Sequence, residues 1–307
     1  MKALVTGGAG FIGSNIVRLL LDEGHEVTVL DNLHSGHRTN LDPFLGVRFV
    51  EGDVRDARAV DDAMDGAEVA FHLAASVGNK RSIDFPIDDA EINVIGTLRV
   101  LEAARSHGTR KVVFSSSAGV FGELKTLPIR EDHPAEPDSP YGASKLGAEK
   151  ACLAYAKLYA LECVCLRYFN VYGVNQRYDA YGNVIPIFAD RMLHRQPVTI
   201  FGDGNQTRDF VNVRDVARAN VGAGMVRDVS GAFNIGAGSR ISINELAMLM
   251  YRTVGREPQI AYAPPRPGDV RDSLADVSAA AAAFGFRPTV PLGEGMSEYL
   301  KWLSTSW

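Results

Sequence analysis

Through the first 170 residues, short runs of apolar and β-branched residues alternate with amphipathic stretches of helical period. A run flanked by helices on both sides is typical of a strand in a parallel sheet that is covered on both faces. Short, right-handed connections between such strands produce a doubly wound α/β sheet. The pattern predicts strands at 2–6, 26–30, 47–53, 68–74, 111–117 and 163–169, and helices near 11–23, 56–65, 86–107 and 141–161.

Beyond residue 170 the pattern changes, because glycine and proline interrupt shorter segments. We expect residues 1–172 to form the sheet-bearing domain and residues 173–307 to form a smaller, mixed α/β substrate-binding lobe. A return of segments near 210–236 to the first domain is left open. The helical patterns of this second half lie near 184–195, 213–226, 242–254 and 293–303, with the alanine run at 279–283 interpreted as part of another helix.

The composition indicates an ordinary globular protein, with 46% apolar and 22% charged residues among 307. A formal charge of −5 argues against a nucleic-acid partner. No apolar run approaches the roughly 20 residues that cross a bilayer, and the N-terminus does not resemble a signal peptide, so we expect a cytoplasmic protein without membrane association. Cys152, Cys163 and Cys165 are expected to be buried free thiols. His34 and His37 lack further ligands in sequence, and we expect no metal site.

Gly7, Gly10 and Gly13 follow the first predicted strand and open the first predicted helix. A glycine turn in this position lets backbone N–H groups approach a pyrophosphate at the helix N-terminus, and its last glycine lets the helix pack close to the sheet. After the second strand, Asp31 can accept hydrogen bonds from an adenosine ribose and repel a 2′-phosphate. The combination predicts a Rossmann-type dinucleotide site that prefers NAD. Arg38, close by in sequence, keeps NADP open.

The third predicted strand ends near Asp53 and Val54, at the edge where an adenine ring is expected to lie. Asp53 also stands shortly before the helical stretch that begins near residue 56, and aspartate is a favoured helix N-cap. Two interpretations of Asp53 therefore stay open: contact with the adenosine, or a cap on the helix.

Tyr141 and Lys145 are four residues apart in SPYGASKLGAEK and so share one face of a helix. A phenol is a poor base at neutral pH, but a nearby ammonium favours the phenolate and lowers its pKa. Such a pair alone is weak evidence. The run Ser115, Ser116 and Ser117 strengthens it, because these serines end the fifth strand at the edge where open α/β sheets bind ligands. A hydroxyl there can hydrogen-bond a substrate alcohol during its oxidation.

At this point the chain resembles the extended short-chain dehydrogenases/reductases, and within them the nucleotide-sugar epimerases of the UDP-galactose 4-epimerase type. The resemblance covers essentially the whole chain, and the joint match of its motifs is highly specific. The motifs, in order, are TGGAGFIGS (6–14), Asp31, HLAA (72–75), SSSAGVFG (115–122), SPYGASK (139–145), RYFNVYG (167–173) and RPGD (266–269).

The resemblance implies that Tyr141 is the catalytic base, that Lys145 binds the nicotinamide ribose and tunes the base, and that Ser117 orients the sugar hydroxyl. Together with the glycine turn, it implies an NAD site formed by Gly7, Gly10, Phe11, Ile12, Gly13, Asp31, Asn32, Asp53, Val54, Leu73, Ala74, Ala75, Asn93, Ser115, Tyr141, Lys145 and Tyr168. It implies contacts to the UDP-sugar from Ser117, Tyr141, Asn170, Arg177, Val184, Phe201, Arg208, Arg266, Asp269 and Ser273.

In this substrate site, the resemblance implies that Val184 and Phe201 bracket the uracil. Arg208 and Arg266 would hold the diphosphate, and Asp269 would contact the uridine ribose. Guanidinium groups suit such oxyanions because their N–H groups form a fixed fork.

The implied reaction is a 4-epimerisation. Tyr141 removes the 4-hydroxyl proton while a hydride passes from sugar C4 to NAD, the flat 4-ketose turns over, and the hydride returns to the other face. NAD should therefore stay bound. Related 4,6-dehydratases and UDP-glucuronate decarboxylases carry an acidic residue after the strand-end hydroxyl, whereas Ala118 and Gly119 follow Ser117 here. A nucleotide-sugar reductase, or a dinucleotide sensor without turnover, remains as the rival.

The sugar is less constrained than the reaction. UDP-glucose and UDP-galactose are favoured, and the small residue Ser273, in the position that gates N-acetylhexosamines in this family, leaves room for them as well. Arg177 keeps UDP-glucuronate open, because an arginine there can pair with a sugar carboxylate. Uronate epimerases of this type usually have threonine where this chain has Asn170, and Arg177 could equally be a surface loop residue.

Two long segments, 86–107 and 141–161, carry more apolar surface than one sheet face should cover. The resemblance implies a homodimer through a four-helix bundle of these segments. The alternative is that they only pack on the sheet. Residues 76–81 are expected to form a loop over the sugar.

Overall fold

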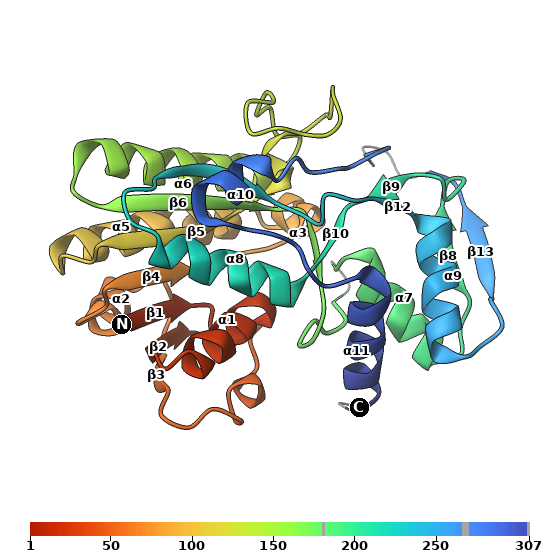
Figure 1. Ribbon diagram of the computed structural model, residues 1–307, viewed down its shortest axis with the longest axis horizontal. Coiled ribbons are helices and arrows are strands. Elements are labelled where there is room, and N and C mark those ends of the chain that lie inside the picture. Colours follow the sequence, from red (N-terminus) through yellow and green to blue (C-terminus); the bar gives the residue numbers. More distant parts are fainter. Residues whose placement is uncertain (180–181, 266–269, 306–307) are drawn as a thin grey trace.

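The computed structural model describes residues 1–179, 182–265 and 270–305. Its main sheet has seven parallel strands in the order β11-β6-β5-β4-β1-β2-β3 (Figure 1). The predicted doubly wound sheet is therefore confirmed, and the segment 210–236 contributes a seventh strand beside the six that were predicted. The strands are β1 (Lys2–Thr6), β2 (Glu26–Asp31), β3 (Arg48–Glu51), β4 (Val69–His72), β5 (Lys111–Ser117), β6 (Glu162–Tyr168) and β11 (Gly231–Ile235).

Helices cover both faces of this sheet, because successive side chains of a strand point to opposite faces. In β1, Ala3 and Val5 pack with α1 (Phe11–Asp22) and α8 (Val213–Met225), whereas Leu4 packs with α2 (Ala57–Met64) and α5 (Thr97–Ser106). The long helix α6 (Pro140–Leu158) joins the second group, and α10 (Ser278–Phe284) joins the first (Figure 1). Each face thus buries its own apolar core.

The predicted helix 86–107 is not regular. It comprises α4 (Pro86–Ala90), a π-helical turn η2 (Glu91–Gly96) and α5, and it is preceded by α3 (Asn79–Asp84). The expected loop at 76–81 is therefore partly helical, since α3 begins at Asn79. A π-helical turn inside a helix often marks a functional site. Here its last residue, Gly96, packs so closely that an added Cβ would lie 2.8 Å from Val54.

The second part of the molecule packs three helices around a separate apolar core that includes Phe188, Met250 and Tyr299. The helices are α7 (Val184–Leu193), α9 (Ile243–Val254) and α11 (Leu292–Thr305). Short sheets pair β8 (Val198–Phe201) with β13 (Ile260–Ala263), β9 (Thr207–Arg208) with β12 (Ile241–Ser242), and β7 (Asn170–Tyr172) with β10 (Phe210–Asn212).

The chain passes between the two parts repeatedly after residue 170, because α8, β11 and α10 return to the main sheet (Figure 1). The division at residues 172 and 173 stays a prediction. Two 3₁₀ turns complete the elements, η1 (Arg38–Asn40) and η3 (Ala118–Val120). Among the described residues, no helix is long and apolar enough to cross a membrane.

Candidate active site

The carboxyl ends of the parallel strands share one edge of the sheet, and the chain order reverses there between β1 and β4. Ligands of open α/β sheets bind in the crevice at such a reversal. This edge gathers eight of the predicted cofactor and catalytic residues, since they end or closely follow strands: Gly7, Asp31, Leu73, Ala74, Ala75, Ser115, Ser117 and Tyr168.

The glycine turn between β1 and α1 has no room for side chains. Gly7 has a positive φ of 69°, and a Cβ on Gly13 would lie 2.1 Å from the carbonyl oxygen of Gly7. Gly10 caps α1 without a side-chain hydrogen bond. The first-turn N–H groups of a helix have no partner within the helix, so those at Phe11 and Ile12 suit an anionic pyrophosphate.

Asp31 ends β2 with its carboxylate almost buried. Its Oδ2 accepts a hydrogen bond from the Ala9 N–H at 2.9 Å, and its Oδ1 accepts one from the Leu33 N–H at 2.8 Å. Burial raises its pKa, although these two hydrogen bonds act in the opposite direction. The Arg38 guanidinium lies 3.9 Å over the ring of Phe49, which gives it a cation–π partner.

Asp53 lies beyond the end of β3 in a small polar cluster. Arg55 holds the pKa of its carboxyl down to about 2 through hydrogen bonds at 2.9 and 3.0 Å, and Asn32 adds one at 2.8 Å. The N-cap of α2 is Asp56, whose side chain accepts from the Arg58 N–H. The interpretation of Asp53 as that cap is therefore wrong. Contact of Asp53 with the adenosine stays a prediction.

The end of β4 and the residues after it are tied to β1 and to the start of α5. The Ala74 N–H donates to Thr6 Oγ1, and the fully buried His72 lies between Thr6 Oγ1 at 2.7 Å and Thr97 Oγ1 at 3.0 Å. Burial lowers the pKa of His72 to about 3, with a smaller effect from the charge of Lys145. His72 is thus neutral, and its two hydrogen bonds hold the end of β4, directly before Leu73, in place.

Ser117, Tyr141 and Lys145 come together where β5 meets the start of α6. Ser117 and Tyr141 lie close together, because an added Cβ on Gly119 would lie 3.3 Å from Ser117 Oγ and 3.7 Å from the Tyr141 ring. Lys145 is 2% exposed and donates from Nζ to the carbonyl oxygen of Ser115 at 2.9 Å. The helix begins here because Ser139 caps it with a hydrogen bond from the Gly142 N–H, with proline at its first position.

The protonation of this group differs from the expectation. Burial raises the pKa of Tyr141 to about 12, the nearby Ser117 hydroxyl lowers it, and the charge of Asp89 raises it further. Burial lowers the pKa of Lys145 to about 8, and Asp89 acts against that change. The expected fall of the Tyr141 pKa beside Lys145 is wrong for the chain itself, because the loss of hydration outweighs the other effects.

A hydrogen-bond network that the sequence analysis missed lies beside the catalytic group. Asn93 donates from Nδ2 to Asp89 Oδ1 at 3.1 Å and to Ser144 Oγ at 3.0 Å, and it exchanges two further bonds with the backbone of Ser76. The predicted cofactor residue Asn93 is thus held on three sides. The four-residue spacing of Asp89, Asn93 and Thr97 could have revealed this buried polar face of the 86–107 segment.

A second missed network is an ion pair beneath the serine run. Glu149 and Arg167 are 0% and 5% exposed at their side chains, and Arg167 donates twice to the carboxylate at 2.7 and 3.0 Å. Ser116 donates to the same carboxylate at 2.7 Å. Glu149 follows Tyr141 and Lys145 at the same four-residue spacing, which was the signal for it. The pair ties α6 to β5 and β6.

Tyr168 and Asn170 lie at the end of β6 and the start of β7. Burial raises the pKa of Tyr168, whose hydroxyl donates to Asn220 Oδ1 at 2.9 Å on α8. Asn170 donates from its backbone and its side chain to the carbonyl oxygen of Asp209, at 3.1 and 3.2 Å. The sequence analysis missed both partners.

Asp209 is fully buried and joins three segments around the second part. Its carboxylate accepts hydrogen bonds from the N–H groups of Ala237, Gly238 and Ala275. Burial raises its pKa to about 6 against the effect of these bonds. It directly follows Arg208, whose guanidinium donates to the carbonyl oxygen of Thr207 at 2.9 Å.

The remaining predicted substrate residues lie on the second part. Val184 begins α7, Phe201 ends β8, and the 6% exposed Ser273 donates from its N–H to the carbonyl oxygen of Thr207 beside Arg208. This hydrogen bond thus places Ser273 beside β9, the strand that ends at Arg208. Two further predicted residues, Arg266 and Asp269, lie outside the described residues.

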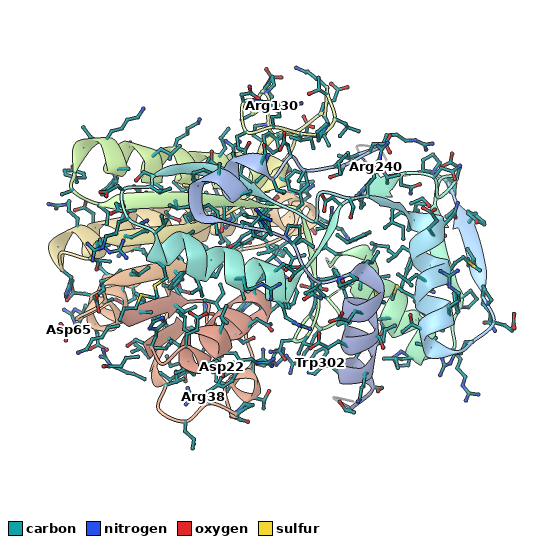
Figure 2. The ribbon with its side chains drawn as sticks, viewed as in Figure 1. Asp22, Arg38, Asp65, Arg130, Arg240 and Trp302 are labelled. Carbon is teal, nitrogen blue, oxygen red and sulfur yellow. The ribbon has the colours of Figure 1, made fainter. Side chains whose placement is uncertain are left out.

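Arg177 has partners on the glycine-turn side of the molecule. It donates to Asn40 Oδ1 at 2.9 Å, and Asn40 donates to the carbonyl oxygen of Ala9 in the glycine turn. Its guanidinium also lies 5.6 Å from the ring centre of Trp302, which Figure 2 shows on the side of α11 that faces the main sheet. These contacts hold Arg177 with α11 and η1, and none of them joins it to Ser117 or Tyr141.

Comparison with known proteins agrees with this geometry. Residues 3–236 match the model of the NAD dependent epimerase/dehydratase family. A putative UDP-glucose 4-epimerase of Methanocaldococcus jannaschii is 42% identical over 306 residues, which cover 99% of this chain and 98% of the relative.

Solved structures with the same fold extend over the whole chain. The UDP-glucose 4-epimerase of Thermotoga maritima, solved with UDP-glucose, has a TM-score of 0.94 at 38% identity and covers 100% of this chain and 99% of that one. The UDP-N-acetylglucosamine 4-epimerase of Methanobrevibacter ruminantium, in complex with UDP-N-acetylmuramic acid, has a TM-score of 0.95 at 34% identity, with coverage of 100% and 99%.

Proposed function

Because the chain belongs to the NAD-dependent epimerase/dehydratase family, we propose that it is an NAD-dependent 4-epimerase that interconverts UDP-glucose and UDP-galactose. The observation that carries the proposal is the meeting of Ser117, Tyr141 and Lys145 at the edge of the sheet where the glycine turn lies. The turn η3 that follows Ser117 is Ala-Gly-Val and contains no carboxylate. This favours epimerisation over dehydration or decarboxylation.

NAD fits the crowded glycine turn and the carboxylate that ends β2. The first turn of α1 would bind its pyrophosphate, Asp31 its adenosine ribose, and Lys145 its nicotinamide ribose. Asp31 carries a negative charge where a 2′-phosphate would add two more, so electrostatic repulsion favours NAD over NADP. When bound, NAD supplies a hydride acceptor, and later a hydride donor, at sugar C4.

The chain's own residues supply orientation and proton transfer. Ser117 holds the sugar 4-hydroxyl through its strand-end hydroxyl group, and Tyr141 takes the proton from that hydroxyl and later returns it. Lys145 places an ammonium one helical turn from Tyr141, and a nearby positive charge favours the phenolate. Arg208 meets the substrate diphosphate, and the sugar turns over about that anchored end.

The UDP-sugar range is set by the second part of the molecule. The buried, small Ser273 supports acceptance of UDP-N-acetylglucosamine beside UDP-glucose, because a roomy pocket rejects a smaller substrate only weakly. UDP-glucuronate is the less favoured candidate, since the contacts of Arg177 with Asn40 and Trp302 supply no partner for a sugar carboxylate.

Turnover with UDP-galactose, UDP-N-acetylgalactosamine and UDP-galacturonate, followed by NMR of the anomeric protons, tests the proposal. We expect the first to epimerise fastest and the second more slowly. Inactivity on all three UDP-sugars would contradict the proposed epimerase activity. Activity on UDP-galacturonate alone would make a UDP-uronate the substrate in place of UDP-glucose and UDP-galactose.

A reductase must exchange its cofactor, whereas an epimerase returns it unchanged. We therefore expect the purified protein to release close to one NAD per chain on denaturation. Consumption of added NADH in proportion to product would instead identify a reductase.

We also propose that the enzyme is a cytoplasmic homodimer joined through α4–α5 and α6. Support comes from large apolar side chains on or beside these helices, with Ile87 71%, Ile95 45% and Leu158 72% exposed. A second copy would remove this apolar surface from water, which stabilises the pair.

A further inference from the structure

A buried carboxylate lies next to the proposed catalytic pair. Asp89 is 1% exposed and belongs to α4, which leads into the π-helical turn. Its Oδ2 accepts a hydrogen bond from Ser144 at 2.5 Å, and its Oδ1 accepts one from Asn93 at 3.1 Å. Ser144 directly precedes Lys145, and its hydroxyl oxygen lies 3.0 Å from the carbonyl oxygen of Tyr141.

The hydrogen-bond partners of Asp89 are neutral, yet a buried carboxylate needs compensation for its lost hydration. The nearby positive group is Lys145 on α6, and the charge of Asp89 acts on it and on Tyr141. The other elements packed on α4 are α3 and η2. Their charged side chains are Lys80, Arg81, Asp84 and Glu91.

Asp89 differs from these neighbours in its effect. Among the charged residues described on α3, α4 and η2, it is the one whose charge acts on both members of the pair. Arg81 is paired with Asp179 at 2.8 Å. Asp88, the neighbour of Asp89 on α4, is exposed. The location of Asp89 therefore gives its charge a specific target.

We propose that Asp89 is a positioning residue for the catalytic pair: its buried negative charge keeps the Lys145 ammonium protonated, and its hydrogen bonds hold the start of α6 against the π-helical turn. This inference rests on the proposed function, in which Tyr141 and Lys145 act together. It adds a carboxylate that touches neither sugar nor cofactor but sets the protonation of the residues that do.

Removal of the charge has a directional consequence. Without Asp89, Lys145 loses a stabilising charge and Tyr141 loses a repulsive one, so both groups should release their protons at lower pH. The pH profile of kcat should then move as a whole to lower pH. A merely structural role would reduce the rate without moving the profile.

The test is Asp89→Asn, which keeps the shape and one acceptor oxygen but removes the charge. The first readout needs no turnover: lysines carrying ¹³C at Cε are titrated by NMR, with the Lys145 resonance identified by its absence in Lys145→Met. We expect its midpoint to fall by about one pH unit, the lower end of the range for a close opposite charge. An unchanged midpoint in folded Asp89→Asn overturns the proposal. If that variant does not fold, Asp89→Ser removes the same charge and keeps a hydrogen-bonding oxygen.

Two controls separate charge from packing. Ser144→Ala loses the hydrogen bond but keeps the carboxylate, and Asp88→Asn removes an exposed charge from the same helix. Both should leave the Lys145 midpoint within about 0.3 pH unit of the wild type, well inside the shift of a close charge. A fall in either variant as large as that in Asp89→Asn would overturn the assignment to Asp89.

The second readout is the pH profile of kcat, which we expect to shift to lower pH by a similar amount in Asp89→Asn. If the wild type does not epimerise any UDP-sugar, the proposed function fails while the NMR titration still tests the charge. If the wild type epimerises and the titration midpoint does not move, the inference about Asp89 alone fails.

Discussion

At the scale of single residues, the site combines groups whose protonation is set by burial. Tyr141 is a poor base in the chain itself, because burial raises its pKa to about 12. To act as a base near neutral pH, Tyr141 therefore requires positive charge nearby. The Lys145 ammonium and the nicotinamide cation of bound NAD would both provide it. We therefore expect Tyr141 to act as a base only with NAD in place.

Substitution of the Tyr141 hydroxyl tests its role. Tyr141→Phe should lower kcat by roughly 10²- to 10⁴-fold, the usual contribution of general acid–base catalysis, while the protein still carries NAD. Steady-state epimerisation and released-NAD assays measure the two effects. Tyr262→Phe, at a 60% exposed residue of β13, is the matched control and should retain wild-type turnover. Equal activity of Tyr141→Phe and Tyr262→Phe would remove Tyr141 from the mechanism.

Asp209 predicts a pH effect on stability. Its pKa is raised to about 6 in the folded chain from the ordinary 3.8, chiefly by burial, so folding favours the protonated form. Its contribution to stability is fully present below pH 3.8 and is lost as the pH rises through about 6. Relative to Asp209→Asn, the free energy of unfolding of the wild type should fall by up to about 3 kcal/mol from about pH 4 to about pH 7.

Urea unfolding of both proteins across this pH range measures the difference. Asp42→Asn, at an exposed loop position, is the control and should run parallel to the wild type. A wild-type advantage over Asp209→Asn that grows with pH would have the opposite sign from the prediction.

At the scale of elements, periodicity predicted six of the seven strands of the main sheet and most helices within a few residues, because alternation of apolar runs and helical stretches is a local property of the sequence. The π-helical turn was not predictable in this way. It depends on the tertiary fit of Gly96 against Val54 and on the bonds of Asn93 to Ser76 and Ser144. The predicted loop at 76–81 is partly helical, since α3 begins at Asn79.

The glycine turn gives a prediction at this scale. In Gly13→Ala, a Cβ would lie 2.1 Å from the Gly7 carbonyl oxygen, so the turn must open. Overpacking costs about 1–3 kcal/mol, which should weaken NAD binding by roughly 5- to 150-fold. NAD content and calorimetric titration measure the loss. Gly222→Ala on α8, where a Cβ would lie 3.5 Å from the carbonyl oxygen of Phe284, should keep wild-type NAD content; NAD retention in Gly13→Ala would contradict the role of the turn.

The buried pair that ties α6 to the sheet predicts a loss of stability. Glu149→Gln leaves the Arg167 guanidinium buried without its carboxylate, and a broken buried pair costs about 3–5 kcal/mol. Urea unfolding should show this decrease. The exposed pair of Arg48 with Asp62 is the control, and Asp62→Asn should change stability by less than about 1 kcal/mol. Similar losses in both variants would show that burial is not the cause.

At the scale of the whole molecule, the sequence predicted one sheet-bearing part and one smaller part but not how often the chain crosses between them. Strand β11 pairs with β6 far from it in sequence, and such pairing leaves little local signal. The catalytic group and the glycine turn were predictable because they sit at strand ends with fixed spacing. Helical spacing could have singled out Asp89 and Glu149, but the partners of these residues and of Asp209 were not predictable, since they come from other elements.

The proposed dimer predicts a change in mass. Ile95→Asp places a charge on the apolar surface of the 86–107 segment and should shift the protein from dimer to monomer in light scattering. Leu45→Asp, at a 93% exposed loop residue, should remain a dimer. A wild type that is already monomeric would contradict the proposed assembly.

The central claim is that a hydride leaves sugar C4 and returns to the same carbon. UDP-galactose carrying deuterium at C4 tests this most directly, with NMR and mass spectrometry of the product. We predict UDP-glucose that retains the deuterium at C4, without net accumulation of NADH, because the hydride never leaves the active site. Deuterium lost to solvent, moved to another carbon of the sugar, or recovered in released NADH would contradict the epimerase mechanism.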